Sequence, residues 1–141
     1  MKPRFLLVLC LSATVWSQTP VAGSSTKPAT PSSDPLTSAK QLAQKGEYED
    51  AATAFKAIVD KDPTSGEARA GLTRSLLRAG KLDEADAAAK AAVAAVPKSA
   101  AVQAAVGDVG FRTGHFVDAE KGYRTAVQLD PNSARGLFGM G

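Results

Sequence analysis

The sequence predicts an all-α protein, an α-solenoid of tandem helix-turn-helix repeats. The first observation behind this prediction is that three glycines recur at one constant interval: Gly46, Gly80 and Gly114. Three prolines keep the same interval: Pro63, Pro97 and Pro131. The second observation is that no window alternates apolar and polar residues with period two, so strands are not indicated. A repeat of roughly 34 residues is typical of solenoids, in which each unit stacks on the next.

Each period holds two helix-length apolar patterns, one on either side of the glycine. Glycine ends the first helix, because it adopts positive φ without a Cβ clash. Proline ends the second, because it lacks an N–H and disfavours helical backbone in the residue before it. We expect helices over residues 37–45, 48–61, 67–79, 82–96, 100–113 and 116–129. Three complete repeats result, at about residues 32–65, 66–99 and 100–133, and residues 134–141 begin a fourth.

Fixed positions within each repeat indicate how its two helices pack. A small residue stands five residues after each glycine, where a methyl group permits close approach of the helices: Ala51, Ala85 and Ala119. A larger apolar residue stands two residues after each glycine: Tyr48, Leu82 and Phe116. We expect these larger residues to close the open end of each hairpin. Four residues beyond each alanine, on the same helix face, come Phe55, Ala89 and Tyr123.

The N-terminal segment has the pattern of a secretory signal peptide. Lys2 and Arg4 precede an apolar stretch that starts at Phe5, and this stretch is too short to span a bilayer of about 30 Å. We expect cleavage after Ser17, which removes residues 1–17. Export to the periplasm or the outside follows, with membrane association only through a partner. A lipoprotein alternative rests on Cys10 and is disfavoured by the bulky Leu9 before it.

Residues 18–35 differ in composition from the rest of the chain. Twelve of these eighteen residues are Pro, Ser, Thr or Gly, which supply no buried face. We interpret the segment as a flexible linker, either a spacer or an N-terminal tail without a role of its own, and place the repeat array at residues 36–141. Without its signal peptide the chain has 15 basic and 14 acidic residues, a net charge of +1, and no cysteine. This balance argues against nucleic-acid binding.

The repeat positions resemble the tetratricopeptide-repeat family, whose unit has roughly 34 residues. Residues of the second repeat that match the family pattern are Leu72, Leu76, Gly80, Leu82, Ala85, Ala92 and Pro97. Those of the third are Val106, Gly107, Gly114, Phe116, Ala119, Tyr123, Ala126 and Pro131. The first repeat departs from the pattern, with Ser38 and Ala39 in place of the leucine and small-residue pair. The resemblance implies the fold over residues 34–141 and leaves the particular function open.

The sequence contains no recognisable catalytic, cofactor or metal motif. His115 has no second histidine or cysteine at ligand spacing, so we interpret it as a solvated turn residue. The stretch GDVGFRTG from Gly107 is not preceded by a strand, and Gly107 and Gly114 already have packing and turn roles, which argues against phosphate binding. We therefore predict a protein that is not an enzyme by itself and needs no cofactor.

Solenoids of this kind bind partners on the concave surface that their first helices line. We expect a partner-binding groove formed by seven residues: Lys40, Arg74, Leu77, Arg78, Asp108, Phe111 and Arg112. This set is mildly basic around an apolar floor, which favours a protein or peptide partner with an acidic segment. The alternative that these arginines are ordinary solvated charges stays open.

Some members of the family hold a partner's C-terminal carboxylate with a lysine and asparagine clamp. The corresponding positions here are Leu36, Lys40, Gly71, Ala101 and Ala105, so the resemblance implies that this clamp is absent. The leading hypothesis is an exported scaffold that binds proteins through its groove. One alternative is the N-terminal arm of a larger exported enzyme, such as a peptidase or transferase, whose catalytic domain lies beyond residue 141. Another is a spacer that only sets distance.

The last residues begin a helix and leave its apolar side chains without a following helix. Leu137, Phe138 and Met140 stand where a solenoid end normally carries polar residues. A short capping helix is one interpretation. We expect instead that the sequence is a fragment of a longer array or multidomain protein.

Overall fold

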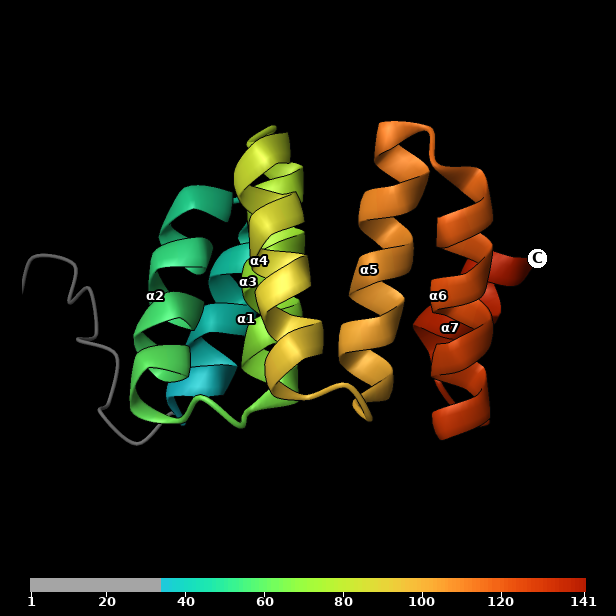
Figure 1. Ribbon diagram of the computed structural model, residues 1–141. Coiled ribbons are helices and arrows are strands. Elements are labelled where there is room, and N and C mark those ends of the chain that lie inside the picture. The colour runs from blue at the N-terminus through green and yellow to red at the C-terminus, as the bar shows by residue number, and fades with distance from the viewer. Residues whose placement is uncertain (1–33) are drawn as a thin grey trace, which may run out of the picture. The chain divides into compact units, whose positions relative to one another are not determined.

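The computed structural model describes residues 34–141, and this part of the chain consists of seven helices without a strand (Figure 1). The helices are α1 (Pro35–Lys45), α2 (Tyr48–Lys61), α3 (Gly66–Arg78), α4 (Leu82–Ala95), α5 (Ala100–Thr113), α6 (Phe116–Leu129) and α7 (Ala134–Met140). The predicted all-α repeat fold is confirmed. The predicted signal peptide, residues 1–17, and residues 18–33 of the predicted linker lie outside the described residues. The linker was expected to extend to residue 35, but Pro35 is the first residue of α1. None of the seven helices is long and apolar enough to cross a membrane.

The three predicted glycine turns reverse the chain within each hairpin. Gly46, Gly80 and Gly114 have φ values of 86°, 80° and 81°, the left-handed region that glycine enters without a steric cost. One residue further on, the backbone N–H reaches back to a carbonyl in the last turn of the first helix, as from Lys81 to Leu76 at 3.0 Å. The regularly spaced glycines therefore mark the C-terminal ends of the first helices.

A second period, that of helix N-termini, was not part of the sequence prediction. Ser65, Ser99 and Ser133 keep the same interval as the glycines, and each side-chain oxygen accepts a hydrogen bond from the backbone N–H three residues later. Serine is among the preferred N-cap residues, because its oxygen satisfies an amide that the helix leaves unpaired. The serines start α3, α5 and α7 two residues after the prolines that follow α2, α4 and α6.

Small residues bring the helices of each hairpin together. Ala51 and Ala85 are fully buried and Ala119 is nearly so, as the repeat pattern predicts. The expectation for the large residues near the turn was wrong at Leu82, which is 38% exposed, and at Phe116, which is 63% exposed. Its ring instead packs edge-on against Phe111, with the two centroids 5.8 Å apart. The α5–α6 turn therefore presents an exposed aromatic pair rather than a buried plug.

Aromatic rings and small residues complement each other across neighbouring helices. A Cβ placed on Gly71 would lie 2.5 Å from the Phe55 ring, and one placed on Gly139 would lie 2.5 Å from the Tyr123 ring. Gly71 and Gly139 are two periods apart. In the intervening repeat the corresponding residues are alanines, Ala89 and Ala105, both buried. An aromatic ring therefore faces a glycine, and a small alanine faces another alanine. This complementarity maintains close packing along the array.

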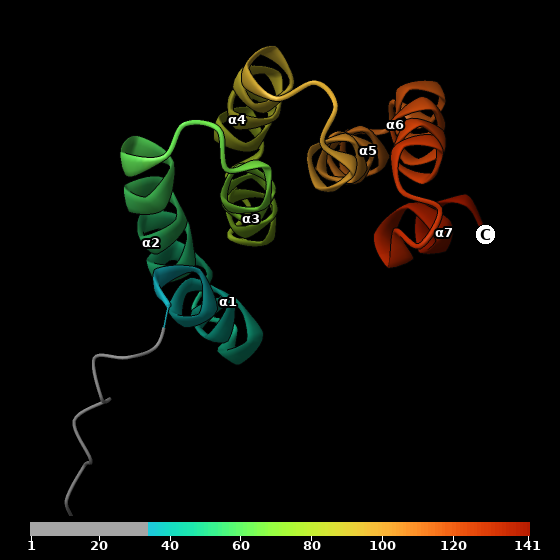
Figure 2. The ribbon, with the colours of Figure 1, turned by 90° about the horizontal axis from the view of Figure 1, so that it is seen from below.

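The first helices of the repeats form one side of the array and the second helices form the other. Figure 2 shows α1, α3, α5 and α7 on the inner side of a curved row, with α2, α4 and α6 on the outer side. Each first helix packs against its own second helix and against the next first helix. Side chains of α1, α3, α5 and α7 consequently line a concave surface, where the sequence placed the groove.

Candidate partner-binding groove

Two adjoining hollows lie on the concave surface, with volumes of about 430 Å³ and about 370 Å³. Tyr48 and Arg78 line both hollows, which makes the two continuous. We call their combined surface the concave groove. All seven residues predicted from the sequence line it: Lys40, Arg74 and Arg78 in the first hollow, and Leu77, Arg78, Asp108, Phe111 and Arg112 in the second.

The first hollow lies between α1 and α3. Phe55 and Gly71 contribute to its lining, and the missing Cβ of Gly71 makes room for the ring. The Arg78 guanidinium lies 5.9 Å from the centroid of the Tyr48 ring, a cation–π distance that places the charge over an apolar wall. Lys40 forms an ion pair with Glu67 at 2.5 Å, so its charge is already partnered.

The second hollow lies between α3, α5 and α7. Phe111 lines this hollow and is 59% exposed, whereas Leu77 is buried and forms its apolar floor. Arg112 is exposed, and among residues 34–141 neither Arg112 nor Arg78 takes part in an ion pair. These two arginines lie one repeat apart, so the concave groove offers two unpaired positive charges beside apolar side chains.

Asp108 lies at the base of the second hollow and differs from the other predicted groove residues. It is 3% exposed, and its carboxylate is surrounded by donors from three other helices. Arg74 Nε donates to Oδ2 at 3.2 Å, Arg135 Nε donates to Oδ1 at 2.8 Å, and the Tyr123 hydroxyl donates to Oδ1 at 2.9 Å. Asp108 therefore ties helices α3, α5, α6 and α7 together and does not offer an open carboxylate to a partner.

The protonation equilibria of the donors reflect this buried cluster. Burial lowers the pKa of the Arg74 guanidinium, while the Asp108 charge acts against that effect. The hydrogen bond to Asp108 raises the pKa of Arg135. Burial raises the pKa of the Tyr123 hydroxyl, and its hydrogen bond to Asp108 raises it further. The raised pKa values favour a charged Arg135 and a neutral Tyr123, whereas burial of Arg74 opposes its charge.

The polar contacts between successive first helices follow one register. Lys40 pairs with Glu67, the Arg74 guanidinium donates to the Ala101 carbonyl at 3.1 Å, and Asp108 pairs with Arg135. The members of each pair are separated by 27 residues, and each pair lies one period after the one before it. The same position thus reaches the first turn of the next first helix in every repeat, although the sign of its charge reverses at Asp108.

Sequence reasoning did not identify Arg135, Tyr48 or Tyr123 as groove residues. Arg135 belongs to α7, and its signal was its place one period after Ala101, at the first turn of a fourth repeat. Tyr48 and Tyr123 belong to second helices, which we had assigned to packing alone. Their rings nevertheless reach between first helices and line the concave groove.

The concave groove has the chemistry of a binding surface. Its lining includes arginines, aromatic rings and the aliphatic side chain of Leu77, contributed by α1, α2, α3, α5, α6 and α7. Within residues 34–141, no group of three histidine, cysteine, aspartate or glutamate side chains is placed to hold a metal ion. The fold and the groove together define an α-solenoid with a concave interaction surface.

Comparison with known proteins identifies the kind of solenoid. The family model described as tetratricopeptide repeat matches residues 42–109. Residues 42–109 therefore match the tetratricopeptide-repeat family, and the described helices have the helix-turn-helix solenoid fold in the register that the sequence predicted. No curated protein matches the sequence.

Solved structures share this fold at low sequence identity. The first tetratricopeptide-repeat domain of human RPAP3 is 19% identical, with a TM-score of 0.66 over 75% of this chain and 84% of that chain. The second such domain of human RPAP3, in complex with the HSP70 peptide SGPTIEEVD, is 17% identical, with a TM-score of 0.62 over 75% and 88%. The Yersinia enterocolitica type III secretion chaperone SycD, in complex with a peptide of the translocator YopD, is 21% identical, with a TM-score of 0.61 over 75% and 86%.

Proposed function

We propose that this protein is a scaffold that binds an extended segment of a partner protein in its concave groove and has no catalysis of its own. The observation that carries the proposal is the pair Arg78 and Arg112, two unpaired arginines one repeat apart in a continuous hollow. Two structures with the same fold were solved with bound peptides, which supports a peptide ligand here.

The charges of the concave groove favour an acidic partner segment. Lys40 pairs with Glu67, and Arg74 and Arg135 share the one buried carboxylate of Asp108. Arg78 and Arg112 are therefore the groove arginines whose charges have no carboxylate partner within residues 34–141. Leu77 and Phe111 lie next to these arginines, at equivalent positions of successive repeats. An acidic side chain or free carboxylate beside an apolar side chain complements this arrangement, because charge pairing and apolar burial then occur together.

Charge reversal in the groove tests this function. We expect the double variant Arg78→Glu and Arg112→Glu to capture less partner protein from an extract of exported proteins, with a weaker dependence on salt, because direct charge pairing is lost. The captured proteins are identified and quantified by mass spectrometry. The matched control is Lys56→Glu with Lys61→Glu, two exposed lysines of the second helix α2 that line none of the hollows of the array.

The control distinguishes groove binding from the alternatives. Normal capture by the lysine variant together with reduced capture by the arginine variant supports the concave groove. Equal loss in both variants, with circular dichroism showing intact helices, would contradict it and favour a spacer role or binding on another face.

We also propose that the protein is exported and that its first 17 residues are removed. This proposal rests on the basic start and the short apolar stretch of the sequence. The intact mass of exported protein tests it, with Gln18 as the expected N-terminus. A mass that retains Met1 would reject cleavage, and a diacylglycerol on Cys10 would instead identify a lipoprotein.

A further inference from the structure

A third and larger hollow lies on the opposite side of the array from the concave groove. Helices α4 and α6 both pack on α5 but do not pack on each other. The hollow between them has a volume of about 980 Å³ and is lined by α4, α5 and α6. Figure 2 shows α4 and α6 on the outer side of the array. We call this hollow the outer groove. Its two walls are α4 and α6, and its floor is α5.

Two residues on the floor of the outer groove are smaller than their counterparts one repeat earlier. Val106 and Gly110 stand one period after Leu72 and Leu76, the larger residues at the equivalent positions of α3. Gly110 cannot be larger here, since a Cβ would lie 2.9 Å from the backbone nitrogen of Ala119. The close approach of α6 to α5 thus requires a glycine, and Gly110 lines the outer groove without a side chain of its own.

The dimensions of the outer groove suit an α-helix. Its lining extends from Leu82 to Ala94 along α4, which at 1.5 Å per residue is a length of about 18 Å. Both walls are helices that run in the same direction. A further helix laid between them would pack against three helices at once, in the manner of a helix bundle. Val106 and Val109 of the floor and Val93 of the α4 wall give the outer groove apolar side chains on which such a helix can pack.

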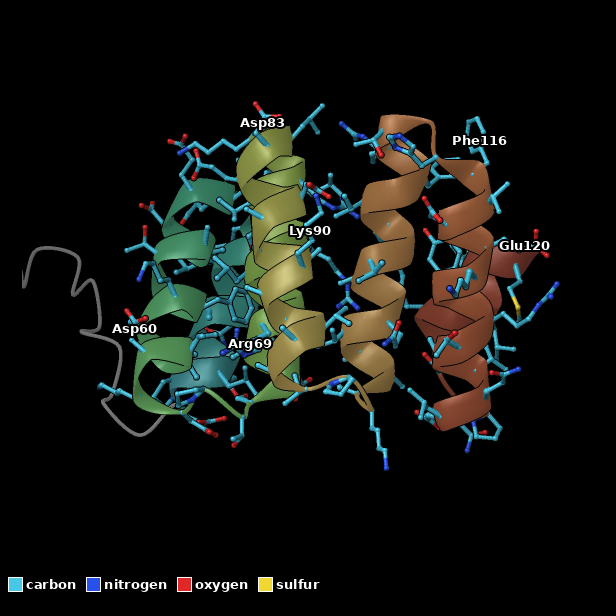
Figure 3. The ribbon with its side chains drawn as sticks, viewed as in Figure 1. Asp60, Arg69, Asp83, Lys90, Phe116 and Glu120 are labelled. Atoms are coloured by element: carbon cyan, nitrogen blue, oxygen red, sulfur yellow. The ribbon has the colours of Figure 1, made fainter. Side chains whose placement is uncertain are left out.

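The charges at one end of the outer groove indicate the direction and chemistry of that helix. Asp83 and Asp118 line the two walls, each in the first turn of its helix, and within residues 34–141 neither takes part in an ion pair. Figure 3 labels Asp83 and Phe116 at the same end of the array, and Asp118 follows Phe116 by two residues. Lysines in the last turn of a bound helix would lie near these two aspartates. Basic residues are also favourable in that turn, because the C-terminal end of a helix carries a partial negative charge.

Two lysines, Lys90 on α4 and Lys121 on α6, line the outer groove nearer its middle. Lys90 is paired with Asp86 at 2.6 Å, so it attracts a ligand less than an unpaired lysine. Lys121 follows Asp118 by about one helical turn on α6 and lines the groove. It complements a glutamate placed one turn before the basic C-terminus of the bound helix.

We propose that the outer groove binds one amphipathic helix of a partner protein, antiparallel to α4 and α6, with its apolar face on α5 and lysines in its last turn. This interaction is separate from peptide binding in the concave groove, because the two surfaces lie on opposite sides of the array. Failure of either one leaves the other standing.

A synthetic helical peptide tests the proposal with the full chain. The probe has a leucine stripe, a glutamate one turn before its end and three lysines in its last turn. A second peptide of the same composition has the lysines in its first turn. Methyl NMR titration is expected to show shifts at Val93, Val106 and Val109 with the first peptide and weaker binding of the second. Shifts confined to Leu77, on the concave side, would overturn the proposal.

Two variant pairs locate the binding. Ala94→Phe adds a ring to an exposed position that lines the outer groove, whereas Ala91→Phe adds one to an exposed position of α4 outside it. We expect the first variant to weaken binding by about tenfold and the second to leave it unchanged. Charge reversal at Asp83→Lys with Asp118→Lys is expected to have a similar effect. Its control is Asp50→Lys with Glu84→Lys, two exposed acidic residues outside the groove.

The remaining outcomes overturn the proposal. Equal affinity of the parent and Ala94→Phe would show that the peptide does not occupy the outer groove. Binding that appears only after residues 1–33 are removed would assign the groove to a segment of this chain. Self-association of the parent that Ala94→Phe abolishes would assign it to a second copy.

Discussion

Asp108 and Arg135 join the third repeat to the start of the fourth, with Arg135 Nε donating to one carboxylate oxygen at 2.8 Å and to the other at 3.1 Å. The same carboxylate accepts from Arg74 in the second repeat. One buried residue of α5 therefore holds the first helices on both of its sides. Because those helices line the concave groove, the contact also sets the relative positions of the groove arginines.

Loss of the Asp108 charge is expected to destabilise the array. Asp108→Asn keeps the side-chain shape but leaves the positive charges of Arg74 and Arg135 without a carboxylate. Removing one member of a buried ion pair costs about 3 kcal/mol in the free energy of unfolding. Urea denaturation measures this cost. The control is Asp86→Asn, which breaks an ion pair with Lys90 on the protein surface and should cost about 0.5 kcal/mol. Equal losses would show that the Asp108 cluster adds little to stability.

The buried hydroxyl of Tyr123 predicts a loss of stability at alkaline pH. Its pKa is raised in the folded state, so the folded protein holds this proton more tightly than the unfolded chain does. The resulting stabilisation is present below the pKa of an unfolded tyrosine, about 10, and decreases as the pH rises above that value. We expect Tyr123→Phe to lower the free energy of unfolding by about 1 kcal/mol at neutral pH, because a hydrogen bond is lost.

The same variant should also reduce the decrease in stability above pH about 10. Urea denaturation at a series of pH values follows both effects. Tyr48→Phe serves as the control, because the Tyr48 ring lines the concave groove and does not hydrogen-bond to Asp108. If Tyr123→Phe and the parent lose stability equally at high pH, titration of the Tyr123 hydroxyl does not limit folding.

The close approach of α5 and α6 makes the array sensitive to a larger residue at Ala119. This alanine is 3% exposed, and its backbone lies against Gly110. We expect Ala119→Leu to lower the free energy of unfolding by roughly 1 to 3 kcal/mol, as overpacking of a filled core does. Ala87→Leu places the same side chain on the exposed face of α4 and should have little effect. Unchanged denaturant midpoints for both variants would contradict the assigned helix contact.

The fold followed from the sequence because its signals are local and repeated. Positive φ at Gly46, Gly80 and Gly114 and the helix ends before the prolines depend only on residues within a few positions. The burial of Ala51, Ala85 and Ala119 follows from the same period. The serine N-caps carried an equally local signal and were missed because the prolines beside them already explained the boundary. The large residue near the turn was misjudged at Leu82 and Phe116, since its exposure depends on the path of the neighbouring helix.

The sequence by itself determined the helices, their order and the face on which Arg78 and Arg112 lie, because a constant period repeats one backbone geometry. Only the tertiary structure decided which charges are available to a partner. Lys40, Arg74 and Arg112 look alike in the sequence, yet Lys40 pairs with Glu67 and Arg74 with a buried carboxylate. Those pairings depend on residues 27 and 34 positions away in the chain, at distances that the packing of successive first helices sets.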